Sequence, residues 1–529
     1  GQNDTTVREK NYPKALSSMH RVLELDPDFQ TAIYHIFDVL AYNKDWTEII
    51  NFALKYNIGS NKNDEKISGK IQPRVLRAYE NLGYLEKAER YYEKIEKNLI
   101  NADSTGEGLC YINAELAINL MEKDALYQRA KYYAEKGLMV CPPKHQLLGK
   151  IYFAFIASTY ELEGDVAGKK AYYQLINNME TKEKYEFTLE FGDAIYWVQN
   201  ESKFHLDNDD ALFYLNLAIE LSKQLEAPKY FTKAIYYYIK VLNEAKGIEF
   251  ASQKMEEQIN EHCDGALNIN CFDINETGSL IDLFYNEGKY NWAKRLLNFQ
   301  VNSIKLFFAE ERFYIDKEGK EFFDNMLSKS HYRLGMMKLK KGDFENARQD
   351  FYDAIATTPN NIPYEKIWLK PQFIKQRIGE CYFKSQNYSN AIKNYRKLFN
   401  KKFEYDYPQL DNLGWDYSNL SMLALSEFLS GQIDSAKVHF SQVEKKYDDI
   451  NDDIKLVDRS YHYYVHWPLY QFHSANGNTN KALRYITDAY HHIPEDERTE
   501  YLQDEKRMEN LHKYYYIYEI IEAYNQNIR

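Results

Sequence analysis

The stretch spanning residues 328–359 most constrains what this chain can fold into. Gly335 and Gly342 stand seven residues apart, and Ala347 and Phe351 follow at the spacing of one helix face. Gly335 allows two helices to approach closely, and Gly342 suits the tight turn between them. Ala347 is small because it faces the first helix at close range. The proline that closes the stretch ends the second helix, since it lacks a backbone N–H. The stretch therefore predicts a helix-turn-helix hairpin.

The small-residue position at Ala347 recurs along the whole chain, and alanine occupies ten of its twelve occurrences. The twelve positions are Ala15, Ile49, Ala88, Ala130, Lys169, Ala211, Ala251, Ala293, Ala347, Ala391, Ala436 and Ala482. A second position agrees independently, because glycine stands five residues earlier in six units. These glycines are Gly83, Gly164, Gly288, Gly342, Gly431 and Gly477. Self-similarity at this period predicts stacked supersecondary units, each burying its apolar face against the next.

These residues resemble the tetratricopeptide repeat, a helix-turn-helix unit of about 34 residues. The resemblance implies an all-α, right-handed superhelical solenoid of about 11–12 repeats. We expect tetratricopeptide-like repeats over 1–300, an extra helix or a break over 301–327, and further repeats over 328–498. Residues 499–529 are expected to form a capping helix, because the end of a solenoid needs a polar outer face.

Composition argues against two classes of partner. The chain has 79 acidic and 67 basic residues, a net charge of −12. Binding to the phosphates of a nucleic acid needs a basic stripe, so no nucleic-acid partner is predicted. No apolar run approaches the roughly 20 residues that a membrane-spanning helix needs.

Five sparse cysteines occur, and none forms a CxxC pair. They are Cys110, Cys141, Cys263, Cys271 and Cys381. This set does not indicate a disulfide framework. Cys263 and Cys271 could pair across a loop, but we expect buried or free thiols. The polar start after Gly1, without Met, favours an extracytoplasmic (periplasmic) location after removal of a signal peptide. A cytoplasmic location stays open.

No motif for catalysis, a cofactor or a metal was found, so none of these sites is predicted. The sequence has no glycine-rich phosphate loop and no GxSxG motif. His462 and His466 are four residues apart and could share a helix face as metal ligands, but no third ligand accompanies them. Packed histidines are the expectation there. Asp207 and the acidic residues after it read as a helix N-cap.

In tetratricopeptide arrays the first helices line a concave surface that holds a peptide, and the resemblance implies such a groove here. The groove residues that it assigns are Lys329, Tyr332, Met336, Phe373, Gln376, Glu380, Phe383, Phe428, Tyr464, Trp467 and Gln471, with Arg333 and Arg377 at the edge. Aromatic and methionine side chains suit apolar anchors of a partner. The alternative is that several of these aromatics pack between neighbouring repeats. The carboxylate clamp of chaperone-binding members does not match, because Tyr332 and Met336 replace its Lys and Asn.

The function expected from these features is a non-enzymatic scaffold that binds a peptide or protein partner on its concave face. One alternative is the sensor or adaptor region of a larger regulator. Another is a small-ligand receptor that stacks a glycan on Trp467, Tyr464 and their aromatic neighbours.

Overall fold

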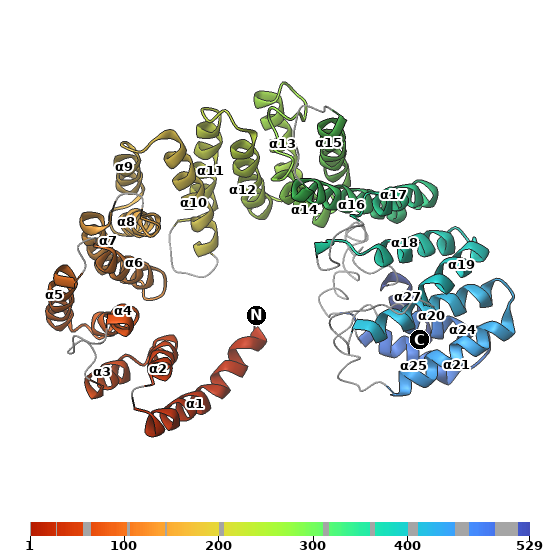
Figure 1. Ribbon diagram of the computed structural model, residues 1–529, viewed down its shortest axis with the longest axis horizontal. Coiled ribbons are helices and arrows are strands. Elements are labelled where there is room, and N and C mark those ends of the chain that lie inside the picture. Colours follow the sequence, from red (N-terminus) through yellow and green to blue (C-terminus); the bar gives the residue numbers. More distant parts are fainter. Residues whose placement is uncertain are drawn as a thin grey trace. The chain divides into compact units, whose positions relative to one another are not determined.

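The computed structural model describes most of the chain as helices joined by short turns (Figure 1). The described residues are 2–27, 29–56, 65–102, 106–142, 145–199, 206–309, 317–359, 366–399, 411–449, 465–491, 493 and 517–528. Within these ranges there are 24 helices and no strand. The expected all-α class is confirmed. By contact density the chain divides into two compact units, Gly1–Ala251 and Ser252–Arg529.

Unit 1 contains a first set of helical hairpins. Its helices are α1 (Gln2–Leu25), α2 (Gln30–Tyr42), α3 (Trp46–Lys55), α4 (Glu65–Asn81), α5 (Leu85–Ala102), α6 (Glu107–Glu122), α7 (Tyr127–Val140), α8 (Leu148–Glu163), α9 (Asp165–Ile176), α10 (Thr181–Gln199), α11 (Asn208–Ser222) and α12 (Pro228–Lys246). The first helices of consecutive hairpins pack directly on one another, α2 on α4, α4 on α6 and α6 on α8.

Unit 2 is also built from helical hairpins. Helix α13 (Ile248–His262) begins in unit 1 and runs into unit 2. The others are α14 (Thr277–Asn286), α15 (Tyr290–Ala309), α16 (Lys317–Lys340), α17 (Phe344–Ala356), α18 (Pro371–Lys384), α19 (Tyr388–Phe399), α20 (Asp411–Leu429), α21 (Ile433–Asp449), α24 (Trp467–Ala475), α25 (Thr479–His491) and α27 (Ile517–Ile528). Here α15 packs on α16, α17 on α18 and α19 on α20, so each second helix meets the next first helix.

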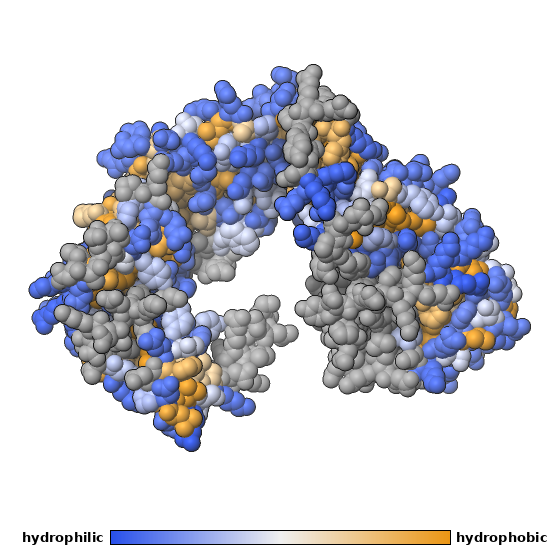
Figure 2. All heavy atoms as spheres, viewed as in Figure 1, coloured by the Kyte–Doolittle hydropathy of each residue, from blue (hydrophilic) through white to orange (hydrophobic). Residues whose placement is uncertain are grey.

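The alanine positions lie on the second helices and face inward. Ala88, Ala130, Ala347 and Ala391 have no exposed surface, and Ala482 has 3%. Opposite Ala347, a Cβ on Gly335 would come within 2.7 Å of the Phe351 ring, so α16 and α17 meet more closely there than a larger residue allows. Figure 2 shows apolar residues mainly in the seams between helices and hydrophilic residues over the outer helix faces.

One repeat is out of register with the sequence prediction. The glycine of α9 that packs closely on the preceding helix is Gly168, one position before the expected Lys169. A Cβ on Gly168 would come within 2.2 Å of Tyr160 on α8, whereas Lys169 is only half-buried and reaches over Phe213. The assignment of Lys169 was therefore wrong, because the aromatic ring of Tyr160 fills the space in which an alanine Cβ would sit.

The turns and caps follow from local sequence. Gly342 adopts a φ of 77°, a left-handed conformation that a glycine reaches without steric cost, between α16 and α17. Asp207 caps α11, accepting hydrogen bonds from the backbone N–H groups of Asp209 (2.8 Å) and Asp210 (3.1 Å). The Asp210 carboxylate accepts the Asp207 N–H in return, which completes a capping box. The N-cap prediction is confirmed.

Two segments bear on the predicted domain limits. In 301–327 the described residues belong to the end of α15 and the start of α16, while the compact units separate at 251–252. In 499–529 the described residues form α27, whose Ile520 and Ile521 are buried in the core of unit 2. No helix in the described ranges is long and apolar enough to cross a membrane.

Four of the five cysteines form disulfides, which corrects the expectation of free thiols. Cys110 on α6 pairs with Cys141 at the end of α7, with a Cα–Cα distance of 4.7 Å. Cys263 pairs with Cys271 across the turn after α13, at 5.6 Å between Cα atoms. Cys381 is free and buried. The first pair was missed because its partners lie far apart in sequence, and only the α6–α7 hairpin brings them together.

Candidate functional site

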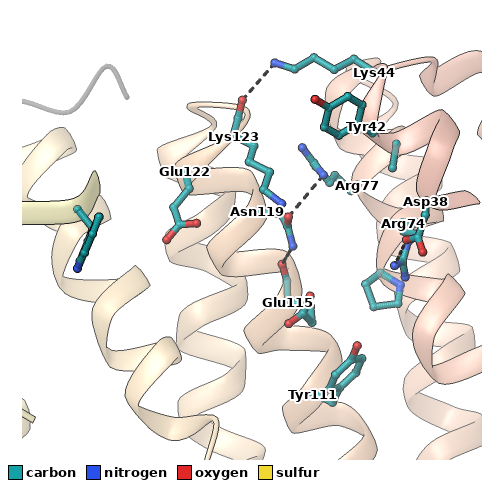
Figure 3. A pocket seen from close by; sticks show the side chains of 13 residues that line it. Asp38, Tyr42, Lys44, Arg74, Arg77, Tyr111, Glu115, Asn119, Glu122 and Lys123 are labelled. Atoms are coloured by element: carbon teal, nitrogen blue, oxygen red, sulfur yellow. Dashed lines mark hydrogen bonds and ion pairs between the residues drawn. The ribbon is translucent and has the colours of Figure 1, made fainter. Parts of the chain in front are cut away.

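A groove of about 860 Å³ lies on the first helices of three consecutive hairpins in unit 1 (Figure 3). Helices α2, α4 and α6 supply most of its lining, because they pack side by side and present the same face. Its residues combine both charges with aromatic rings. They are Asp38, Ala41, Tyr42, Lys44, Pro73, Arg74, Arg77, Tyr111, Glu115, Asn119, Glu122, Lys123 and Trp197.

Helix α6 forms one wall of the groove. Tyr111, Glu115 and Asn119 follow one another at four-residue spacing, so they share one helix face. Figure 3 shows this row opposite Arg74 and Arg77 of α4. The α6 wall thus carries an aromatic ring and a carboxylate, and the facing side carries two arginines, of which Arg74 is paired with Asp38.

Arg74 is held in place by neighbours on α2. Its guanidinium pairs with the Asp38 carboxylate and donates a hydrogen bond to the Tyr34 hydroxyl at 3.1 Å. It also lies 4.8 Å from the centre of the Tyr34 ring, a cation–π distance. Across the groove, burial raises the pKa of Tyr111, and the charge of Glu115 adds to the effect. Tyr111 therefore stays a neutral donor at physiological pH.

A buried ion pair anchors the floor of the groove. Both nitrogens of the Arg77 fork donate to Asp124, at 2.6 and 2.7 Å, and Asn81 donates to the same carboxylate at 2.8 Å. The Asp124 side chain has no exposed surface. Because every Asp124 oxygen has a donor, this pair fixes α4 against the α6–α7 turn. The remaining Arg77 nitrogen donates to Asn119 at 3.5 Å.

A second buried carboxylate, Glu80, lies on α4 about one turn after Arg77. Arg129 of α7 donates to both oxygens of Glu80, at 2.8 and 2.9 Å, and the Tyr133 hydroxyl donates at 2.6 Å. The Glu80 side chain is fully buried. Burial, with the charge of Glu80 as a second cause, raises the pKa of Tyr133. These contacts hold the groove helices rigidly, so the groove is preformed.

Trp197 of α10 lines the groove with 57% of its surface exposed. The Lys240 ammonium lies 4.5 Å from its ring centre. An exposed tryptophan beside a cation provides a flat apolar surface with a polar rim, which is typical of binding hot spots.

The prediction from sequence did not include this groove, although the repeat spacing assigns residues to it. The prediction projected the groove offsets only onto the C-terminal units. Relative to Ile49, Ala88 and Ala130, the same offsets fall on residues that line the groove. These are Asp38, Ala41, Pro73, Arg77, Glu115, Asn119 and Glu122.

The residues predicted from the resemblance lie on the first helices of unit 2. On α16, Lys329 is exposed, and Tyr332 and Met336 pack at the edge of the α16–α18 core. Arg333 pairs with Asp282 of α14. Burial lowers the pKa of Arg333 to about 10. The structure thus places this row of α16 between a core and a neighbouring helix.

Helix α18 carries the next predicted row. Phe373 is 39% exposed, whereas Gln376 and Glu380 are buried. Arg377 donates to Glu380 at 2.6 Å and to the Tyr332 hydroxyl at 3.4 Å, so it joins the rows of α16 and α18. Phe383 is half-buried and packs against the core of unit 2.

The last predicted residues lie on α20 and α24. Phe428 and Trp467 pack against the core of unit 2, and Trp467 stacks on Tyr470 at 5.4 Å between ring centres. Gln471 is half-buried. Tyr464 and His462 lie outside the described residues, and His466 is buried beside Tyr485. The assignment of these unit 2 residues to a groove stays a prediction.

Comparison with known proteins identifies the repeats. The chain is an α-helical repeat protein by its fold, and the tetratricopeptide-repeat family model matches residues 74–97 and 328–361. The chain therefore carries tetratricopeptide repeats in a helical array, as its sequence predicted. The matched segments cover α4, one of the groove helices, from Arg74 onward with most of α5, and α16 from Ser328 onward with α17.

Solved structures with a likeness to the chain are helical proteins of low identity. A human IFIT1 dimer with PPP-AAAA is 16% identical, covering 90% of this chain and 94% of its own, with a TM-score of 0.23. A circular tandem repeat protein is 11% identical, covering 99% and 96%, with a TM-score of 0.15. TM-scores this low carry no inference about function. No curated protein matches the sequence.

Proposed function

We propose that this chain is a non-enzymatic scaffold that holds a peptide segment of a partner protein in the unit 1 groove. The observation that carries the proposal is the groove of about 860 Å³ on α2, α4 and α6, with aromatic rings between walls of opposite charge. Tetratricopeptide repeats typically serve as interaction scaffolds, which agrees with this function.

The groove suits an extended segment with both apolar and charged side chains. Tyr42, Tyr111 and Trp197 offer aromatic surfaces for apolar anchors, because burying such rings supplies most of the energy at interfaces. Arg74, which pairs with Asp38, and Glu115, which pairs with Lys150 at 3.6 Å, offer polar contacts on the two sides of the groove to a dipolar segment. Charges at the rim contribute selectivity and association rate more than affinity.

Rigidity makes such binding efficient. The Arg77–Asp124 and Arg129–Glu80 pairs hold the groove helices before a partner arrives, so little conformational entropy is lost on binding. Arg74 and Arg77 in the groove are committed to ion pairs with Asp38 and Asp124, which favours a binding role over a catalytic one.

Selection from a displayed library of linear peptides, followed by titration of the best binder, tests the proposal. Tyr111→Ala should weaken binding at least tenfold, the loss of about 1.4 kcal/mol that a hot-spot residue causes. Tyr173→Ala is the matched control, because Tyr173 is an exposed tyrosine of the second helix α9 and should leave affinity unchanged.

Two outcomes would contradict the unit 1 assignment. If the selected peptides bind Tyr111→Ala and Tyr173→Ala with equal affinity, the peptide contacts lie outside the unit 1 groove. If the Tyr332→Ala, Trp467→Ala double variant alone lost binding, the contact would be the unit 2 surface predicted from sequence. Selection of single-stranded RNA in place of peptides would refute the class of partner.

A further inference from the structure

A cluster of three metal-ligand side chains lies within the α16–α17 hairpin, separate from the groove. His331 comes from α16, and Asp350 and Asp353 come from α17. One ring nitrogen and one oxygen of each carboxylate lie within 4.8 Å of one another. Asp350 and Asp353 are three residues apart, so they share a helix face and point at His331 together. We propose that this cluster binds a divalent transition-metal ion of the Zn²⁺ type.

Burial makes the cluster unusual for a purely structural contact. His331 is 5% exposed and Asp350 is 8% exposed. The Nδ1 atom of His331 and the Oδ2 atom of Asp350 are both buried without a hydrogen bond. Buried polar atoms in folded proteins nearly always have partners. The buried Nδ1 atom of His331 therefore indicates a partner that is not a protein group, whereas Oδ2 of Asp350 already has the Lys338 ammonium as its ion partner.

The electrostatics of the cluster also favour a bound cation. Burial is the largest cause that raises the pKa of Asp350, and the nearby Asp353 carboxylate adds to it, while the Lys338 ammonium acts in the opposite direction. A divalent cation would compensate both carboxylates and occupy the imidazole lone pair. This electrostatic stabilisation is largest at buried positions, because charge interactions strengthen as the local dielectric constant falls.

Lys338 is the competitor for this position. Its Nζ lies 2.7 Å from Oδ2 of Asp350 and forms an ion pair with it. The Lys338 side chain is 31% exposed, so the ammonium can move into solvent while its carbon stem stays packed. A metal ion would displace the ammonium from Asp350, and removing the ammonium should favour the metal.

The ligand set indicates the class of metal. Imidazole with carboxylates suits Zn²⁺, whereas Mg²⁺ prefers oxygen ligands alone. Zinc–ligand bonds of about 2.0–2.2 Å place tetrahedral ligand atoms about 3.4 Å apart. Side-chain rotation brings the present cluster to that spacing. Three protein ligands leave a fourth position for water.

The test is calorimetric titration of the chelator-treated 529-residue chain with ZnCl₂, and with MgCl₂ for comparison. The wild-type chain should bind one equivalent of Zn²⁺ that Asp353→Asn binds at least about tenfold more weakly. Glu345→Gln is the matched control, because it removes one exposed acidic charge from the same helix and should bind as the wild type does.

Lys338→Met separates the metal site from a simple ion pair. It should bind Zn²⁺ more tightly than the wild type, and Zn²⁺ should raise its unfolding temperature more. Equal affinities for the wild type, Asp353→Asn and Lys338→Met would overturn the proposal. Binding of Mg²⁺ as tightly as Zn²⁺ would overturn the assigned metal class. None of these variants touches the unit 1 groove, so peptide binding tests the proposed function separately.

Discussion

Two buried carboxylates of unit 1 and one of unit 2 have different surroundings. In unit 1, Asp124 and Glu80 each receive a two-pronged arginine contact and a further donor, so their buried oxygens are satisfied. In unit 2, Asp350 has a single lysine as its ion partner and an acidic neighbour. The difference teaches that burial alone does not identify a functional site. A carboxylate with a full set of hydrogen-bond donors holds helices together, whereas a carboxylate with fewer donors is available to a ligand.

The same substitution in both units should therefore have unequal effects. Asp124→Asn leaves Arg77 buried without its countercharge, and we expect the free energy of unfolding to fall by about 3 kcal/mol. Chemical denaturation followed by circular dichroism measures this loss. Glu86→Gln serves as the control, since the Glu86–Arg90 pair is exposed and worth little. A loss below about 1 kcal/mol for Asp124→Asn would refute the structural role of the pair.

The Glu444 contacts in unit 2 should make stability depend on pH. A hydrogen bond from His473 is the largest cause that lowers the pKa of Glu444 to about 2, and Lys481 lowers it further. A depressed carboxyl pKa means that its stabilisation is present at neutral pH and is lost as the pH falls from about 4.5 toward 2. Because Glu444 is half-buried, solvent screening reduces this contribution to the order of 1 kcal/mol.

Denaturation of Glu444→Gln and of the wild type between pH 5 and pH 2 checks this expectation. The two stability curves should converge as the pH falls. Glu86→Gln is the control, because the exposed Glu86–Arg90 pair should leave the pH dependence unchanged. Parallel curves for Glu444→Gln and the wild type would show that the pKa of Glu444 is not depressed.

Asp350→Asn should have the smallest effect on stability. Burial raises the pKa of Asp350 above its ordinary value, so its charged form costs stability at neutral pH. In the presence of a chelator, we expect the free energy of unfolding at pH 7 to rise by less than about 1 kcal/mol. A loss as large as that of Asp124→Asn would mean that the Lys338–Asp350 pair is structural, and it would remove the contrast between the units.

The repeat architecture was predictable from the sequence, because each hairpin needs a small residue at the closest helix approach. Ala347, Ala391 and Ala482 are buried on second helices as expected. The predicted small-residue position at Lys169 was wrong by one residue, because packing against Tyr160 requires the glycine at Gly168. Single-residue shifts of this kind depend on a neighbouring ring. A periodic pattern predicts which faces are buried more reliably than which residue makes the closest contact.

The candidate sites were less predictable, because each combines residues from separate helices. Arg77 and Asp124 are 47 positions apart, and no local motif links them. His331, Asp350 and Asp353 form a ligand set only after α16 folds against α17. The aromatic residues Phe428 and Trp467 look like anchors in the sequence, yet they pack against the core of unit 2. Sequence spacing does not distinguish a ring that binds a partner from a ring that supports a neighbouring repeat.

The Cys110–Cys141 bond has a practical consequence for handling the protein. It ties α6, the acidic wall of the groove, to the far end of its partner helix α7. Disulfides persist under oxidising conditions and open in reducing ones. Material made in a reducing host, or stored with a thiol reagent, would present this wall without its covalent tether. Binding assays should therefore begin from oxidised protein whose thiol content has been counted, with Cys381 as its single unpaired cysteine.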